Sequence, residues 1–118
     1  MIGSSILTSV KKCINGIPES DESFDEDLIL FINSRLATLC QLGVGPDEGF
    51  RINDKSATWE EYIQDTRLEF VKDYIVTSVQ LRFAPPESSY VLNALKEQLN
   101  ELTFRINVIA EQIKEENG

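Results

Sequence analysis

The sequence predicts an all-α domain, a small bundle of about four helices in which two long helices form a hairpin. Apolar residues recur every three or four positions over long stretches, and Pro85-Pro86 separates the two longest of these stretches. The second of them carries seven apolar residues at alternating spacings of three and four. With 118 residues, 42% of them hydrophobic, the chain has the size of a single domain, 1–118, with a modest core.

The first predicted helix covers about residues 5–15, where apolar residues recur at helical spacing, and Gly16 and Pro18 end it. An acidic stretch follows at residues 19–27. Its last acids lie near the positive end of the next predicted helix, so we expect a solvated loop that leads into a capped helix entrance.

The second predicted helix covers about residues 25–42, and its apolar residues occupy much of the helix circumference. This pattern predicts a central, largely buried helix. Gly43 stands where a helix commonly ends in a left-handed turn. Cys13 and Cys40 lie within apolar stripes and form no close metal-binding pair, so we expect buried, reduced thiols.

The connection at residues 43–58 alternates weakly in polarity around an Asn-Asp pair. It favours either a short β-hairpin or an ordered excursion. Long connections inside a compact domain are often functional. We therefore predict partner contacts here, through Val44, Phe50 and Ile52.

Thr58 and Glu61 form a capping box, which predicts the start of a long helix that continues to about Phe83. Pro85-Pro86 must end this helix, and a final helix extends to about Glu115. Two long helices joined at a tight corner predict a helical hairpin.

The final helix carries a seam of apolar residues with heptad spacing, which is typical of knobs-into-holes packing. Two interpretations stay open: packing within the chain against the preceding long helix, or association with another helix. The seam consists of Leu92, Leu95, Leu99, Leu102, Ile106, Ile109 and Ile113.

Phe104 and Val108 lie four residues apart on a face of the final helix well away from that seam. A helix whose seam is already packed does not need them for its own core. They predict either a subunit contact or a wide apolar stripe that the chain's own N-terminal helix buries.

Charge and composition exclude several classes of function. Eleven Lys and Arg against 20 Asp and Glu give a net charge of −9, which disfavours gripping the phosphates of nucleic acid. Histidine is absent, so the commonest general base and metal ligand is missing. The chain shows neither a leader peptide nor an apolar run of about 18 residues, and we expect a soluble, unsecreted protein with no membrane contact.

No catalytic, metal-binding or cofactor-binding residue is predicted. Glu61, Asp65 and Glu69 are spaced four apart and could pair on a metal, but no second ligand cluster supports them, so a solvated helix face is favoured. Residues 21–27 imitate a calcium loop only briefly, because Glu26 stands where such a loop needs glycine.

Residues 81–92, Leu-Arg-Phe-Ala-Pro-Pro-Glu-Ser-Ser-Tyr-Val-Leu, and residues 99–107, Leu-Asn-Glu-Leu-Thr-Phe-Arg-Ile-Asn, resemble a family of neck proteins of tailed bacteriophages. These are the head–tail connector, or adaptor, proteins of siphophages that infect Gram-positive bacteria. Upstream, Gly43-Val44-Gly45-Pro46, Gly49-Phe50 and Thr58-Trp59 also match the pattern. The likeness runs through most of residues 40–107.

The resemblance implies a structural subunit of a homo-oligomeric ring of twelve copies beneath the phage portal protein, in the neck of a virion assembled in the host cytoplasm. The ring extends the DNA channel and docks a tail-side stopper or tail-terminator protein. DNA passes through without sequence-specific binding, which suits a charge of −9 on every copy. The family implies no catalytic residue and no cofactor.

Two other functions stay open. The chain could be a helical protein-binding module or assembly chaperone that uses the heptad seam to capture a partner helix. A hydrolase or metal enzyme that uses Glu61 and Asp65 is disfavoured, because no second shell of residues supports such a site.

Overall fold

The computed structural model describes residues 5–14, 20–46, 48–62 and 69–117, except for the side chains of residues 113, 114, 116 and 117. Within these ranges the chain forms helices and no strand, which confirms the all-α class. The helices are α1 (Ile6–Lys12), α2 (Asp25–Gln41), α3 (Trp59–Tyr62), α4 (Phe70–Phe83) and α5 (Ser89–Asn117).

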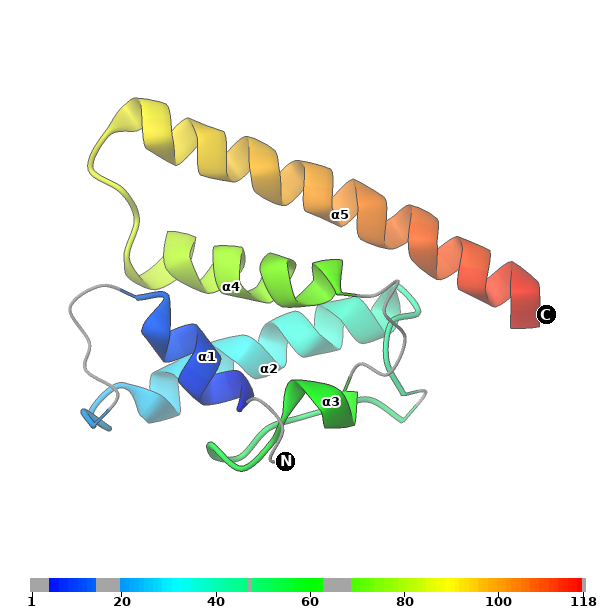
Figure 1. Cartoon of the computed structure of the whole chain (residues 1–118), viewed down its shortest axis with the longest axis horizontal. Helices are drawn as coiled ribbons and strands as arrows, with labels where there is room; N and C mark the ends of the chain where they lie inside the picture. The colour runs from blue at the N-terminus through cyan, green and yellow to red at the C-terminus, as the bar shows by residue number, and fades with distance from the viewer. Residues whose placement is uncertain (1–4, 15–19, 47, 63–68, 118) are drawn as a thin grey trace.

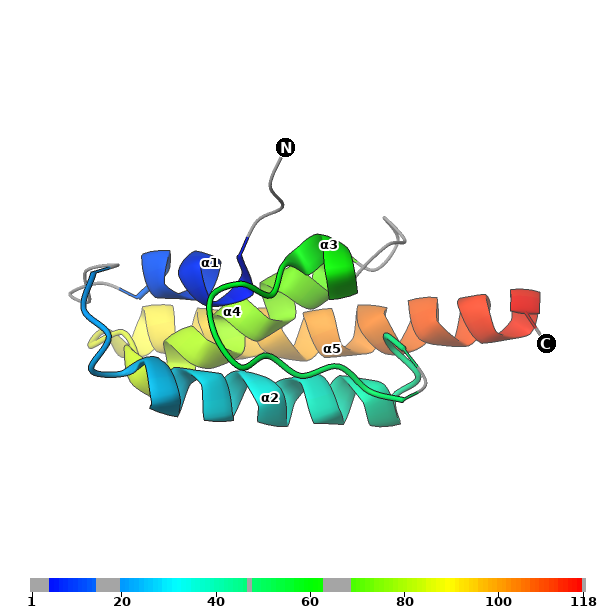
Figure 2. The same ribbon diagram turned by 90° about the horizontal axis from the view of Figure 1, so that it is seen from below.

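The helices pack around α4, which lies between α5 on one side and α2 on the other (Figure 1). Helix α1 packs against α2, and α1 and α3 lie on the same side of the molecule (Figure 2). At 1.5 Å per residue, α5 is about 43 Å long and extends well past the end of α4. Because α4 separates them, α2 and α5 each keep one face directed away from the bundle.

Helix α1 begins where the sequence predicts. The Ser5 side chain accepts a hydrogen bond from the Thr8 amide at 3.2 Å, and the Ile6 amide donates to the Ala57 carbonyl at 3.0 Å. An isolated antiparallel bridge pairs Ser5 with Thr58. These contacts tie the start of the chain to the end of the 43–58 connection.

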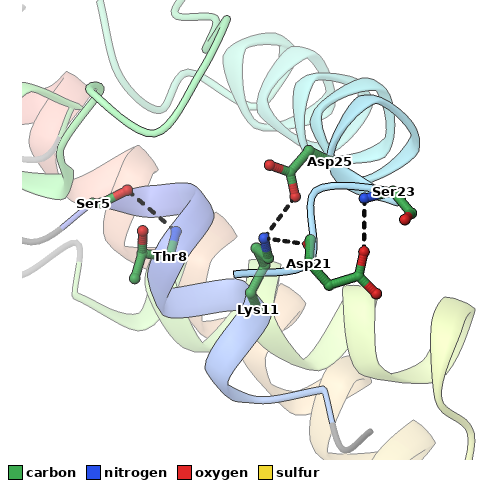
Figure 3. A network of polar contacts seen from close by, with 6 residues as sticks. All are labelled: Ser5, Thr8, Lys11, Asp21, Ser23 and Asp25. Atoms are coloured by element: carbon green, nitrogen blue, oxygen red, sulfur yellow. Dashed lines mark hydrogen bonds and ion pairs between the residues drawn. The ribbon is translucent and has the colours of Figure 1, made fainter. Parts of the chain in front are cut away.

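A buried lysine joins α1 to the start of α2 (Figure 3). Lys11 is only 4% exposed, and its Nζ lies 2.8 Å from both the Asp21 carbonyl oxygen and the Asp25 carboxylate. A buried ammonium group is costly unless it is paired in this way. Hydrogen bonds from Ser23, together with the charge of Lys11, lower the pKa of Asp21 below its usual value.

Helix α2 ends in a Schellman motif, as Gly43 predicts. The Gly43 amide donates to the Cys40 carbonyl at 3.0 Å, and the Val44 amide donates to the Leu39 carbonyl at 2.9 Å. Gly43 has the positive φ of +92° that this turn requires. Val44 and Leu39 are both buried, which adds the apolar contact that commonly accompanies the motif.

The capping box at the start of α3 is confirmed. The Glu61 amide donates to the Thr58 hydroxyl at 3.2 Å, and the Thr58 amide donates to a Glu61 carboxylate oxygen at 3.0 Å. One continuous helix from Thr58 to Phe83 is wrong, however, because α3 and α4 are separate helices that do not share an axis (Figure 2). Residues 63–68, which the prediction included, lie outside the described residues.

The helical hairpin of α4 and α5 is present. Helix α4 ends at Phe83, where the Ala84 amide still donates to the Gln80 carbonyl, and Pro85 and Pro86 follow. Helix α5 then runs back antiparallel to α4 (Figure 1). The hairpin corner is therefore set by the two prolines, as predicted.

The apolar seam of α5 packs within the chain only along its middle. Leu102 and Ile106 are buried in the core, and half-buried Leu99 packs against it. The other described members, Leu92, Leu95 and Ile109, are half-buried. The side chain of Ile113 lies outside the described residues. The core itself also includes Leu28, Ile32, Leu36, Leu39, Val71, Ile75 and Val79.

Two further expectations are corrected. Helix α2 is less buried than the predicted central, largely buried helix, because only the stripe that contains Leu28, Ile32, Leu36 and Leu39 is fully buried, and Leu30 is 69% exposed. Both cysteines are free, but Cys13 is exposed and Cys40 is half-buried. In both cases the apolar periodicity is helical, as predicted, but the rest of the bundle buries less of the apolar surface than the periodicity suggests.

Candidate assembly surface

The 43–58 connection is an ordered excursion that runs along α2, and its described residues form no β-hairpin. Asn33 on α2 holds it with two hydrogen bonds: its side-chain amide donates to the Ile52 carbonyl at 2.9 Å, and its side-chain oxygen accepts from the Ile52 amide at 2.8 Å. The side chain thus pairs with both backbone groups of Ile52, as a neighbouring strand would.

The predicted contact residues of this excursion face inward. Val44 and Ile52 are 2% and 1% exposed, and the Phe50 ring packs on Tyr62 with the ring centroids 5.0 Å apart. Burial raises the pKa of the Tyr62 hydroxyl. Val44 and Ile52 anchor the excursion and half-buried Phe50 packs against the core, so its exposed side chains are polar: Glu48, Arg51, Asn53, Asp54, Lys55 and Ser56.

The tip of the excursion is an Asx turn. The Asp54 carboxylate accepts hydrogen bonds from the amide and the hydroxyl of Ser56, and these bonds lower the pKa of Asp54 below its usual value. The excursion therefore has a defined shape on both its buried and its exposed side.

Phe104 and Val108 lie on the outer side of α5, where they are 68% and 38% exposed. The N-terminal helix α1 packs on α2 instead, so the alternative in which α1 buries these two residues is wrong. Arg105, beside them, forms an ion pair with Glu101 at 2.7 Å, and its guanidinium lies 5.7 Å from the centre of the Phe70 ring. Among the predicted contact residues, these two form the accessible apolar surface.

Phe104 and Val108 belong to a longer pattern that the sequence interpretation missed. Eight residues recur at spacings of four and three along the outer side of α5, and they alternate as two apolar residues and then two acids. We call this set the outer stripe of α5: Tyr90, Ala94, Glu97, Glu101, Phe104, Val108, Glu111 and Glu115. All eight are exposed, Tyr90 at 85%. The spacing itself was the signal, because it forms a second heptad pattern opposite the apolar seam.

A second exposed surface lies on α2. Leu30, Ser34, Ala37 and Gln41 recur at spacings of four, three and four, and all are exposed. We call them the outer face of α2. None of them is charged over about three helical turns, although charged residues make up 26% of the chain. The signal for this face was the absence of charge at these positions.

The three carboxylates considered for a metal or catalytic site do not form one among the described residues. Glu61 is engaged in the capping box, Glu69 directly precedes α4, and Asp65 is not among the described residues. No group of three metal-ligating side chains occurs in the part of the chain that the structure describes. In that same part, no helix combines the length and apolarity needed to cross a bilayer.

Comparison with known proteins identifies one family. The family model described as phage connector protein matches residues 6–113, which include the N-terminal helix that the sequence resemblance left out. No curated protein and no solved structure matches the chain. The family is a structural one, so membership implies a non-enzymatic role in assembly with other virion proteins. Because the match covers most of the sequence, the chain belongs to the phage connector protein family.

Proposed function

We propose that this chain is the subunit of a head–tail connector ring in the neck of a phage virion. The ring sits beneath the portal protein, extends the DNA channel and docks a tail-side stopper or tail-terminator protein. The observation that carries the proposal is the outer stripe of α5, with Phe104 68% exposed on a member of a connector family.

Exposed aromatic and aliphatic side chains on one helix face are typical of protein–protein contacts. Phe104 and Val108 are not needed for the subunit's own core, because the opposite side of α5 already packs Leu102 and Ile106 into the bundle. The polar surface of the excursion, which includes Arg51 and Asp54, supplies a second region for contact with the portal protein or the next subunit.

The net charge of −9 supports passage of DNA through such a ring. A surface with the same sign as the phosphate backbone repels it, so DNA slides without forming stable contacts. Binding of the free protein to duplex DNA should accordingly be undetectable at physiological salt.

The alternative function, capture of a partner helix by the apolar seam, conflicts with the packing of the seam. Leu102 and Ile106 contact the chain's own core, so they are unavailable to a partner unless the hairpin opens. The outer stripe of α5 offers a contact surface that needs no such opening.

The proposal is tested by measuring the mass of the purified protein, alone and mixed with portal protein, by native mass spectrometry and negative-stain microscopy. We expect rings of the wild-type chain, with or without portal. Phe104→Asp should prevent ring formation at the concentration at which the wild type assembles. The matched control is Gln98→Asp, which adds the same charge to an exposed position about a third of a turn around α5. A wild-type chain that remains monomeric and never joins the portal would contradict the proposal.

A further inference from the structure

The outer face of α2 is flanked by arginines for which the described residues supply no carboxylate partner. On one side, two arginines stack on a pair of phenylalanine rings. The Arg35 guanidinium lies 5.3 Å from the centre of the Phe31 ring, and the Arg82 guanidinium lies 5.8 Å from the centre of the Phe83 ring. The two rings pack edge-on, with their centroids 5.7 Å apart. On the other side, Arg51 is exposed. None of these arginines forms an ion pair in the described part of the chain.

These arginines are notable in a chain with so large an excess of acids. Carboxylates lie at one end of the face, in the first turn of α2, but from Leu30 to Gln41 the face itself carries no charge. A hollow between α2 and the excursion adjoins it and is lined by Ala37, Phe50 and Arg51 among others. The surface therefore carries small and apolar residues along its centre. Arg35 and Arg82 lie on one flank, whereas on the other flank Arg51 is accompanied by Glu48 and by Glu26, which precedes Leu30 by one helical turn.

The outer stripe of α5 has the complementary character. Phe104 and Val108 lie between two pairs of acids, Glu97 with Glu101 and Glu111 with Glu115. Only Glu101 is paired, with Arg105, and the other three acids form no ion pair with a described residue. Apolar residues framed by acids therefore lie on one helix, and apolar residues bordered along one flank by two arginines lie on another.

The two surfaces are separated within a subunit, because α4 lies between α2 and α5 (Figures 1 and 2). Two different complementary surfaces on different sides of a subunit produce a heterologous, head-to-tail contact, which closes into a ring when the rotation between neighbours allows it. A surface that paired with its own copy would instead produce a closed dimer. The arrangement of the two surfaces therefore favours a ring.

We propose that Phe104 and Val108 of one copy dock on the outer face of α2 in the next copy, centred on Leu30, with Glu97 directed towards Arg35 and Arg82. This inference rests on the proposed ring, since it names the two surfaces that join its subunits. Leu30, 69% exposed, is the apolar centre of the receiving surface.

The test uses two variants that each damage one surface. Leu30→Asp leaves the outer stripe of α5 intact, and Phe104→Asp leaves the outer face of α2 intact. Each alone should raise the subunit concentration needed for assembly at least about tenfold. Mixed at equal amounts, they should form a one-to-one dimer and nothing larger, because only one intact pair of surfaces remains. Native mass spectrometry resolves the two variants by mass.

Two controls separate surface loss from misfolding. Both positions are more than two-thirds exposed, so at a concentration too low for assembly the circular-dichroism melting curves of the variants should match that of the wild type. Arg82→Glu should raise the assembly concentration by up to about fivefold and reduce its salt dependence, as expected for a charge at the rim of an interface.

The outcomes distinguish this inference from the proposed function. If Leu30→Asp assembles like the wild type while Phe104→Asp does not, the ring stands and the receiving surface is not α2, which overturns the inference alone. A mixture that forms no heterodimer also overturns it. A wild-type chain that stays monomeric with and without portal removes both the ring and the inference.

Discussion

Truncation of two isoleucines on the same helix tests whether the apolar seam of α5 holds the subunit together only at its middle. Ile106 is 1% exposed and belongs to the core, whereas Ile109, three residues later, is half-buried. The two substitutions, Ile106→Ala and Ile109→Ala, remove the same atoms and give the same small gain in helix propensity, so the difference between them reports burial alone.

The expected magnitudes follow from that difference. A fully buried Ile→Ala change costs about 2–5 kcal/mol, because the lost transfer energy is increased by the cavity left behind. At the half-buried position about half of the transfer energy is at stake and solvent fills the gap, so about 1 kcal/mol is expected. For a chain of this size 1 kcal/mol corresponds to about 4 °C, which places the two variants roughly 4–16 °C apart in melting temperature.

The free energy of unfolding is measured by urea titration, followed by circular dichroism at 222 nm. The Phe104→Asp background keeps assembly from contributing to the apparent stability. Equal losses at the two positions, or a larger loss for Ile109→Ala, would refute the assignment of Ile106 to the core and of Ile109 to its margin. A change in the slope of the titration would instead report an altered unfolded state.

Three further predictions concern the excursion. Gly45→Ala should destabilise the chain by about 2–4 kcal/mol in urea titration, because φ is +88° and the added Cβ atom would lie 2.7 Å from a ring carbon of Tyr62. The matched variant Gly43→Ala has a similar φ of +92° but open space around the added Cβ atom, so it should lose only about 1 kcal/mol. Asn33→Ala removes both side-chain hydrogen bonds to the excursion and should cost about 2–4 kcal/mol, with faster hydrogen exchange confined to that segment. Ser56→Ala removes the hydroxyl hydrogen bond and should raise the pKa of Asp54, measured by carboxyl NMR titration; an unchanged pKa would contradict that bond. Since the folded-state pKa is depressed, the stabilisation is present above about pH 4 and is lost as the pH falls through the lower folded-state value.

The features that the sequence predicts well are those set by local chemistry. The capping box at Thr58, the Schellman turn at Gly43 and the corner at Pro85-Pro86 all occur as expected. Each depends on a few neighbouring residues whose hydrogen-bonding groups or fixed dihedral angles admit few alternatives. The helical hairpin follows from them, because two apolar helices joined by a tight corner must pack together.

The features that were missed depend on tertiary contacts. The pattern from Thr58 to Phe83 satisfies helical periodicity, yet it forms two helices, since Trp59 and Tyr62 are both buried in the core beside the excursion. Alternation at residues 50–58 indicated extended backbone, but the Asn33 side chain on α2 supplies the pairing that a second strand would have given. Periodicity alone cannot reveal such a partner, which lies 19 residues earlier in the chain.

The predicted contact residues also differ in whether local geometry or tertiary packing decides their exposure. Phe104 and Val108 were identified because they lie opposite a seam that was already explained, an argument that needs only helical geometry. Val44 and Ile52 are predicted as contacts because they are apolar residues in a long loop, but apolarity does not distinguish a buried anchor from an exposed contact. Leu30 stands within the apolar run of residues 28–32, so the sequence does not distinguish it from the core residues of the same helix.

The way α5 is fastened has a mechanical consequence. Its contacts with the core are concentrated at Leu102, Ile106 and Ala110, near the centre of the rod, while both ends reach beyond that attachment. Phe104 lies between two of these contact points, so a load applied there passes directly into the rigid bundle, whereas the same load at Glu115, near the end of α5 that extends past α4, would bend the helix. If neighbouring subunits join at Phe104, the angle between them is set at the stiffest point of the helix. Such placement lets identical subunits repeat one angle closely enough for a ring to close.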